Sequence, residues 1–349
     1  MASDLSIREA FLDQAQSCEA LGSPFNARLC RLVSERLIDN NAVAKRLLSW
    51  PGDTTSKGDS VPLRLAGTLH ALALKGLNVA LASVYPPHHV DDDALWAAVS
   101  NALVENESFI QERLNSAPQT NEVRRSAALL PGFLTLASMF GLPFKLSEVG
   151  ASAGLNLQWD RYRYQLADFV WGGPSAVTLA PEWQGAPPPL ADIMVAERAG
   201  CDLNPLDPTS SDDQMRLFSY IWPDQTDRLA RTRAALDIAT SNHLSVTRSD
   251  AIEWLKTRLA QPQDGLIHVI YHSVAWQYLP EHLKAEGEAL IQRAGQQATM
   301  QAPLARLQME ADGQRGAALT LQIWPTGEQR EIGRADFHGR WIKWFGWAR

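Results

Sequence analysis

The sequence predicts an α/β protein in which an all-helical region precedes a mostly parallel sheet. Residues 1–140 repeat apolar side chains at helical spacing and contain no convincing alternating strand. Beyond residue 140, short apolar runs alternate with helical stretches, which indicates parallel strands covered by helices on both faces. The C-terminal stretch reads instead as strand, turn and strand. We therefore predict a helical domain over residues 1–125 and an α/β domain over residues 126–349, whose sheet ends in an antiparallel hairpin.

The helices of the first region follow from apolar periodicity and from the turn residues between periodic stretches. Gly22, Ser23 and Pro24 end the first stretch, and residues 51–62 have the composition of a loop. The helical stretches are REAFLDQAQSCEALGS, FNARLCRLVSERLIDN, NAVAKRLLSW, a pair of helices at 63–84, and DDDALWAAVSNALVENESFIQERLNS. We expect the last of these to be one helix with acids at its positive N-terminal end.

The elements of the second region are predicted in the same way. Its β-like runs are FKLSEVG, DIMVAERAG, LSVTRSDA, LIHVIYHSVAW and LARLQME. Helical stretches lie between most of them: DQTDRLARTRAALDIATS, AIEWLKTRLAQ and PEHLKAEGEALIQRAGQQ. In the C-terminal segment, LTLQIW and REIGRADF alternate as strands do. Five parallel strands followed by a hairpin are therefore expected.

Composition and charge narrow the classes of partner. The net charge is -7, the pI is about 5.6 and no basic stretch forms a patch, which argues against nucleic acid and acidic membranes as partners. The three cysteines lack metal-ligand spacing, so we expect free thiols, a reducing compartment and no metal site. No signal-peptide pattern and no apolar run of membrane-spanning length is present. We expect a cytoplasmic protein, and the sequence indicates no oligomeric state.

The stretch KLSEVGASAGLNLQWD, residues 145–160, contains two catalytic signatures at once. As G-x-S-x-G it is the nucleophile elbow of serine hydrolases, with Ser152 as the nucleophile. As a glycine-rich turn from Glu148 through Gly150 and Gly154 to Asn156, it is typical of nucleoside-cofactor sites. Both interpretations require a strand, a tight turn and a helix.

The order of the predicted elements favours the cofactor interpretation. A hydrolase elbow follows several strands and an oxyanion-hole segment, whereas about 140 mostly helical residues precede this one. The turn ends the first strand of the sheet, where open α/β folds bind ligands. An acid two residues before the first glycine resembles the pattern of S-adenosylmethionine methyltransferases, whose sheet also finishes with an antiparallel hairpin.

Longer motifs carry a second resemblance. TNEVRRSAALLPGF, SEVGASAGLNLQWDRYRY, ERAGCDLNPLDP, IWPDQTDRLARTRAAL and YHSVAWQYLP look like an uncharacterised bacterial family, known only as domain-of-unknown-function family 2332. The resemblance spans nearly the whole chain and implies a methyltransferase-like, Rossmann-like fold with no established activity. We expect S-adenosylmethionine as cofactor and a small molecule as methyl acceptor. A non-catalytic nucleoside-binding or interaction protein on the same fold is the alternative, and a serine hydrolase using Ser152 is a third.

The first group of candidate residues belongs to the glycine-rich turn. Gly150 and Gly154 would shape it, Glu148 would accept a hydrogen bond from the cofactor's amino group, and Ser152 would donate to its carboxylate. Asn156, on the expected helix, would reach back toward the cofactor. Ser152 replaces the middle glycine that methyltransferases carry. The alternative is a tight connection that needs glycine and nothing more.

Acids at the next strand ends are candidates for the adenosine half. Asp202 is preferred for the ribose hydroxyls because it follows a predicted strand, with Asp168 and Asp207 in reserve and residues 165–190 as an insertion. The resemblance implies that Asp250 meets the adenine amino group and that the Ala251 N–H meets a ring nitrogen. The alternative for Asp250 is a helix N-cap.

The end of the fourth predicted strand supplies candidate catalytic residues. His272 would act as general base, and Ser273, Gln277 and Tyr278 would orient the acceptor. The alternative is a structural histidine satisfied by the backbone.

A polar cluster before the first strand is the last candidate group. Asn121, Glu122 and Arg124 would border the cleft and contact substrate. The alternative is a capped helix start.

Overall fold

The computed structural model describes residues 4–347 and divides the chain into two compact units. The helical unit contains the chain up to Thr120 together with Ser211–Ala230. The sheet unit contains Asn121–Ser210 and the chain from Arg231 onward. This division differs from the expected boundary after residue 125, because a segment from the second half of the sequence completes the helical unit.

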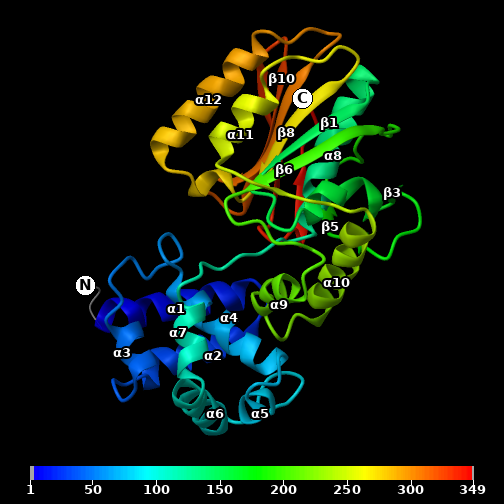
Figure 1. Cartoon of the computed structure of the whole chain (residues 1–349). Helices are drawn as coiled ribbons and strands as arrows, with labels where there is room; N and C mark the ends of the chain where they lie inside the picture. Colours follow the sequence, from blue (N-terminus) through cyan, green and yellow to red (C-terminus); the bar gives the residue numbers. More distant parts are fainter. Residues whose placement is uncertain (1–3, 348–349) are drawn as a thin grey trace. The chain divides into compact units, whose positions relative to one another are not determined.

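The helical unit is built from short helices around one apolar core (Figure 1). Polar residues cap several of its helices; Ser23, Asn41 and Asp91 each accept a backbone N–H from the first turn. The expected helix over DDDALWAAVSNALVENESFIQERLNS is two helices, because the chain turns at Asn106. The helices are α1 (Asp4–Ala20), α2 (Pro24–Arg36), α3 (Ala42–Leu48), α4 (Val61–Leu74), α5 (Val79–Ala82), α6 (Asp92–Glu105), α7 (Glu107–Arg113) and α9 (Ser211–Ser219).

Helix α9 joins this unit through buried polar and aromatic contacts. The side chain of Arg113 donates to Ser219 Oγ at 2.9 Å, and His70 Nδ1 lies 3.2 Å from the Ser219 carbonyl oxygen. The ring of Tyr220 packs so closely on Gly67 that any side chain at Gly67 would collide with it. The sequence pattern gave no sign of this pairing, because α9 is short and far along the chain from its partners.

The sheet unit contains a nine-stranded mixed sheet. Its strands are β1 (Phe144–Val149), β5 (Glu182–Gln184), β6 (Val195–Asp202), β7 (Thr247–Arg248), β8 (Ile267–Ser273), β9 (Leu304–Ala311), β10 (Ala317–Trp324), β11 (Glu328–Ala335) and β12 (Trp341–Trp344). The order is β5-β12-β11-β10-β9-β8-β1-β6-β7. Strands β7, β6, β1, β8 and β9 are parallel, whereas β9 to β12 form an antiparallel meander. The mixed, mostly parallel sheet and the N-terminal helical region are confirmed; the C-terminal part is longer than one hairpin.

Helices cover both faces of the parallel strands (Figure 1). On one face, α11 (Ala251–Arg258) and α12 (Glu281–Gly295) share an apolar cluster with β1 and β8. On the other face, Phe133 of α8 (Arg125–Phe140) stacks on Trp159 at 4.0 Å and meets Tyr271 of β8 edge-on. The remaining helix, α10 (Thr226–Ser241), crosses the division between the units. Because both faces of the sheet are covered, every residue of β1 is buried.

The crossover from β1 to β6 is irregular. The helix expected after the glycine-rich turn is the 3₁₀ helix η1 (Leu155–Arg161), so that prediction of an α-helix is wrong. The chain then forms a three-stranded sheet, β3-β2-β4, from β2 (Arg163–Leu166), β3 (Phe169–Trp171) and β4 (Thr178–Leu179). This small sheet occupies the segment expected to be an insertion.

Candidate functional site

The parallel strands place a topological switch point between β1 and β8. From β1 the chain moves outward to β6 and β7, then returns to the other side of β1 for β8 and β9. In doubly wound sheets, ligands bind outside the carboxyl ends of the strands at this point. Here those ends are the turn Gly150–Gly154 after β1 and the segment 274–278 after β8.

The turn contains left-handed residues at alternate positions. The φ angles are 70° at Gly150, 54° at Ser152 and 71° at Gly154. A Cβ at Gly150 would lie 2.5 Å from the Cβ of Ala275, and one at Gly154 would lie 2.5 Å from Leu244. Both glycines therefore allow the turn to pack closely on neighbouring protein segments, in addition to supplying the backbone angles.

Hydrogen bonds fasten this turn to neighbouring segments. The N–H groups of Gly150 and Ala151 donate to the Cys201 carbonyl, and the Ser152 N–H donates to Asp202 Oδ2 at 2.9 Å. The Leu155 N–H donates to Asn121 Oδ1 at 2.9 Å. Most of the turn's donors are thus used within the protein, so the turn is a rigid support rather than an open anion cradle.

Ser152 lacks the partner that a nucleophile needs. Its side chain is buried, and no hydrogen bond reaches its Oγ from any residue between 4 and 347. A serine nucleophile requires a general base within hydrogen-bond reach. The left-handed backbone resembles a hydrolase elbow, but the base is missing from its surroundings.

Glu148 lies beneath the turn, with only 2% of its surface exposed. Burial raises the pKa of its carboxyl well above the usual range, and the charge of Asp202 raises it further; the hydroxyl of Tyr271 and Arg125 oppose the shift. The Tyr271 hydroxyl lies 3.5 Å from Glu148 Oε2. Burial therefore favours the protonated, neutral form of this carboxyl.

The structure brings the expected substrate cluster to the expected cofactor turn. Asn156 Oδ1 accepts a hydrogen bond from Ser126 at 2.7 Å, and its amide donates to the Glu122 carbonyl at 3.3 Å. Asn121 holds the turn, as described above, and the Arg124 N–H donates to Glu122 Oε1. Asn121, Glu122 and Asn156 are buried, so they position the turn from below.

Sequence reasoning missed two residues of this cluster. Arg125 is buried and donates to the carbonyls of Ser273 and Phe337, which ties the start of α8 to the end of β8. Ser126 fixes Asn156. Sequence reasoning singled out the neighbouring Asn121, Glu122 and Arg124. Only the fold distinguishes the buried Arg125 from the half-buried Arg124 beside it.

The acids occupy three kinds of position. Asp202 ends β6 and contacts the turn, with its other oxygen accepting the Asn204 N–H. Asp250 caps α11, its Oδ1 accepting the N–H groups of Ile252 and Glu253, as the capping alternative anticipated. Ala251 is the first residue of that helix. Asp168 lies exposed in the turn between β2 and β3, and Asp207 closes an exposed turn onto Thr209. Of these three aspartates, Asp202 is the one that hydrogen-bonds to the glycine-rich turn.

His272 is enclosed on the face of α12. Its Nδ1 donates to Glu310 Oε1 at 2.7 Å, its Nε2 accepts from Arg306 at 3.2 Å, and its ring stacks on Trp276. Burial lowers its pKa, and the bond to Glu310 opposes that shift. Both nitrogens are occupied, so in this arrangement neither is available to a substrate.

The residues after His272 are placed differently. Ser273 is buried, and its carbonyl accepts from Arg125. The Gln277 side chain accepts the Ala311 N–H at 3.0 Å. Tyr278, at the end of η2 (Trp276–Tyr278), is exposed.

Fold and site together define a doubly wound α/β protein with a glycine-rich turn at its switch point. The chain belongs to the bacterial family described as "Uncharacterized protein conserved in bacteria (DUF2332)", which matches residues 8–344. Neither the curated proteins nor the solved structures yield a match. Among the described residues, no helix has the length and apolar character needed to cross a membrane.

Proposed function

We propose that the chain binds S-adenosylmethionine at the carboxyl edge of its parallel strands and transfers the methyl group to a small molecule. One observation carries the proposal: four strand ends meet at the switch point. The turn Gly150–Gly154 contacts Asp202 after β6, and Ser249 after β7 donates to the Asp202 carbonyl. Gly150 lies against Ala275 after β8. Nucleotide-type cofactors bind at this edge of doubly wound folds.

The side chains at this edge fit the adenosine half of the cofactor. Asp250 uses Oδ1 for the helix cap, which leaves Oδ2 as an acceptor for an amino or hydroxyl group. Asp202 supplies a second carboxylate. Leu203 and Tyr278 are 64% and 65% exposed, and such apolar surfaces suit the faces of a planar base.

The site offers fewer contacts to the amino-acid half of the cofactor than to its adenosine half. Glu148 and Ser152 are both buried, and burial raises the pKa of the Glu148 carboxyl. When bound, the cofactor supplies an activated methyl group. The chain would then act by holding acceptor and methyl group in line, since positioning alone lowers such barriers substantially. Gln277 and Tyr278 are the side chains that we assign to orienting the acceptor.

Calorimetry with S-adenosylhomocysteine tests the proposal. We expect binding by the wild-type chain, weakened about tenfold by Asp250→Asn, because the amide keeps Oδ1 for the cap but turns the second acceptor into a donor. The matched control is Asp91→Asn, which alters the cap of α6 in the helical unit and should leave the affinity unchanged.

Adenosine alone is the second ligand of this test. Equal affinity for adenosine and S-adenosylhomocysteine would agree with an enclosed Glu148. Absence of binding at millimolar concentrations of both would reject the cofactor proposal and leave the interaction-protein alternative.

A further inference from the structure

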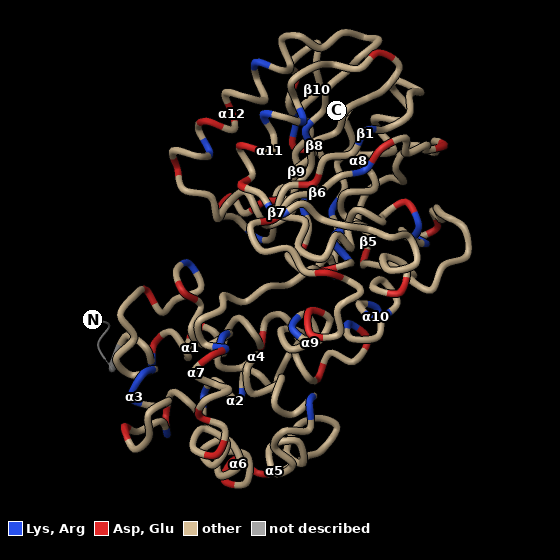
Figure 2. Tube along the Cα trace, in the orientation of Figure 1, with Lys and Arg blue, Asp and Glu red and all other residues tan. Residues whose placement is uncertain are grey.

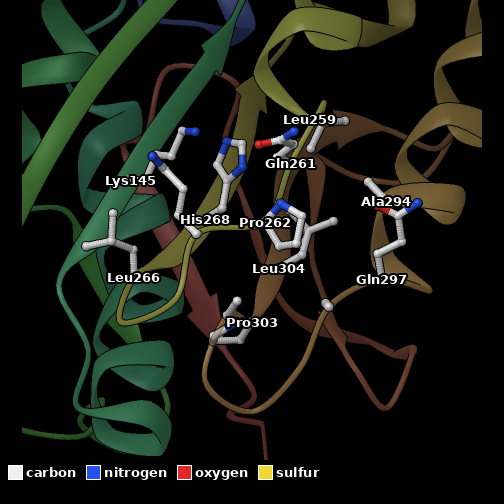
Figure 3. Close-up of a pocket in the computed structure, with 13 residues that line it drawn as sticks. Lys145, Leu259, Gln261, Pro262, Leu266, His268, Ala294, Gln297, Pro303 and Leu304 are labelled. Atoms are coloured by element: carbon white, nitrogen blue, oxygen red, sulfur yellow. The ribbon is translucent and has the colours of Figure 1, made fainter.

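A second hollow lies at the opposite edge of the sheet, at the amino ends of β1, β8 and β9 (Figure 3). It is open to solvent and is bordered by the ends of α11 and α12. Because β1 runs from Lys145 near its start to Gly150 after its end, this hollow is separated from the glycine-rich turn by the length of a strand. It therefore plays no part in the function proposed above.

The walls of the hollow are mostly apolar. The apolar lining consists of Leu259, Pro262, Leu266, Ala294, Ala298, Ala302, Pro303 and Leu304. The polar lining consists of Lys145, His268 and three glutamines, and none of the described lining residues is an acid. A pocket with one cation, several amides and no carboxylate selects for an anion.

Lys145 is the cation without a counter-ion. Lys145 is only 8% exposed, and its ammonium makes no hydrogen bond or ion pair within residues 4–347. Glu197, its register partner on β6, is paired with Arg258. Burial lowers the pKa of Lys145, and the charge of Arg258 lowers it further while Glu197 opposes the shift. An anion placed beside the ammonium would relieve this cost.

His268 supplies a second donor beside Lys145, its register partner on the neighbouring strand. Ser147 Oγ is fully buried, accepts from Arg258 Nε at 3.0 Å, and lies 2.8 Å from His268 Nε2. The hydroxyl hydrogen of Ser147 therefore has Nε2 as its acceptor, and the ring carries its own proton on Nδ1. Burial, together with the charges of Lys145 and Arg258, lowers the pKa of His268 to about 3, so the imidazole is neutral near pH 7. Nδ1 makes no hydrogen bond to a described residue, so its N–H is free to donate to a ligand.

We propose that this hollow binds a small monocarboxylate with a short apolar chain. Its carboxylate is held by the ammonium of Lys145 and the Nδ1–H of His268. Its chain lies against Leu259, Pro262 and Leu304. A ligand with two carboxylates is disfavoured, because the hollow offers one buried cation.

Titration calorimetry with sodium hexanoate tests the proposal, with hexanamide as the neutral analogue. We expect wild-type protein to bind hexanoate and Lys145→Met to bind it at least tenfold more weakly, whereas hexanamide should bind both equally weakly. Lys343→Met removes an exposed lysine elsewhere in the sheet unit and should bind hexanoate as the wild type does.

Thermal unfolding separates loss of binding from loss of structure. Lys145→Met should melt no lower than the wild type, because it replaces an unpaired buried ammonium by an apolar chain of similar length. Equal hexanoate affinity in wild-type protein and Lys145→Met would overturn the proposal. So would the absence of hexanoate binding by the wild type.

Discussion

The carboxyl group of Glu148 shows how burial can change the chemistry of one residue in a predicted binding motif. The fold places it under the turn that it was expected to serve, beside Tyr271 and away from solvent. An acid whose pKa is raised in the folded state stabilises the fold only while it is protonated. That stability is complete below the pKa of the unfolded chain and is lost as pH rises through the folded-state pKa.

Replacing Glu148 with glutamine should therefore stabilise the protein at alkaline pH. The amide keeps the shape of the neutral acid and cannot ionise. We expect a higher melting temperature than wild type at about pH 8, and little difference at about pH 5, where the wild-type carboxyl is protonated in the folded state. Glu9→Gln, at an exposed carboxyl, serves as the control. A variant that melts below the wild type at both pH values would contradict a raised pKa for this buried acid.

At the scale of elements, the sequence predicted most strands of the parallel sheet. A strand buried on both faces is a short apolar run, and β1, β8 and β9 each appear as one. Strand β6, which is only partly buried, was also predicted. The helix after the glycine-rich turn was not predicted correctly. Left-handed residues at alternate positions tighten the chain, and contacts with distant partners such as Asn121 then shape the 3₁₀ helix η1. Because these contact residues are remote in sequence, the local sequence pattern does not predict them.

The segment after β8 is held by one partly buried carboxylate. Glu310 accepts hydrogen bonds from His272 and from the N–H groups of Ala275, Trp276 and Gln277. Burial alone would raise the pKa of Glu310, but these donors lower it overall. Its contribution to stability is present above the unfolded-state pKa and is lost as pH falls through the folded-state pKa.

Glu310→Gln should consequently destabilise the sheet unit near neutral pH. The substituted amide would point N–H groups at other donors, at a cost of about 2 kcal/mol in the free energy of unfolding. Urea unfolding at about pH 7 measures the loss, which should narrow toward about pH 4. The exposed Glu328→Gln should show no such change. An unchanged free energy of unfolding in Glu310→Gln would show that backbone packing alone fixes the segment.

At the scale of the whole molecule, the helical unit depends on residues 211–230. Trp222 packs with Cys18 and Ala27, and Tyr220 covers Gly67. A chain that begins at Asn121 leaves these apolar side chains without their partners. It should aggregate, whereas the same chain with residues 211–230 replaced by a glycine–serine linker of equal length should be monodisperse in size-exclusion chromatography. Aggregation of both chains, or of neither, would show that this segment does not decide solubility.

Because the helical unit is discontinuous in sequence, its parts are synthesised at different times. A chain leaving the ribosome presents helices α1 to α7 first, but α9 emerges only after β1 and β6 have been made. The helical core therefore stays incomplete until about two thirds of the chain has been translated, although domains usually fold as units while the chain emerges. During that interval the residues that contact Tyr220 and Trp222 lack these partners. Strand β1 likewise lacks its neighbour β8, which is made later. Nascent chains stalled before residue 211 should accordingly be the species that trigger factor-type chaperones hold longest.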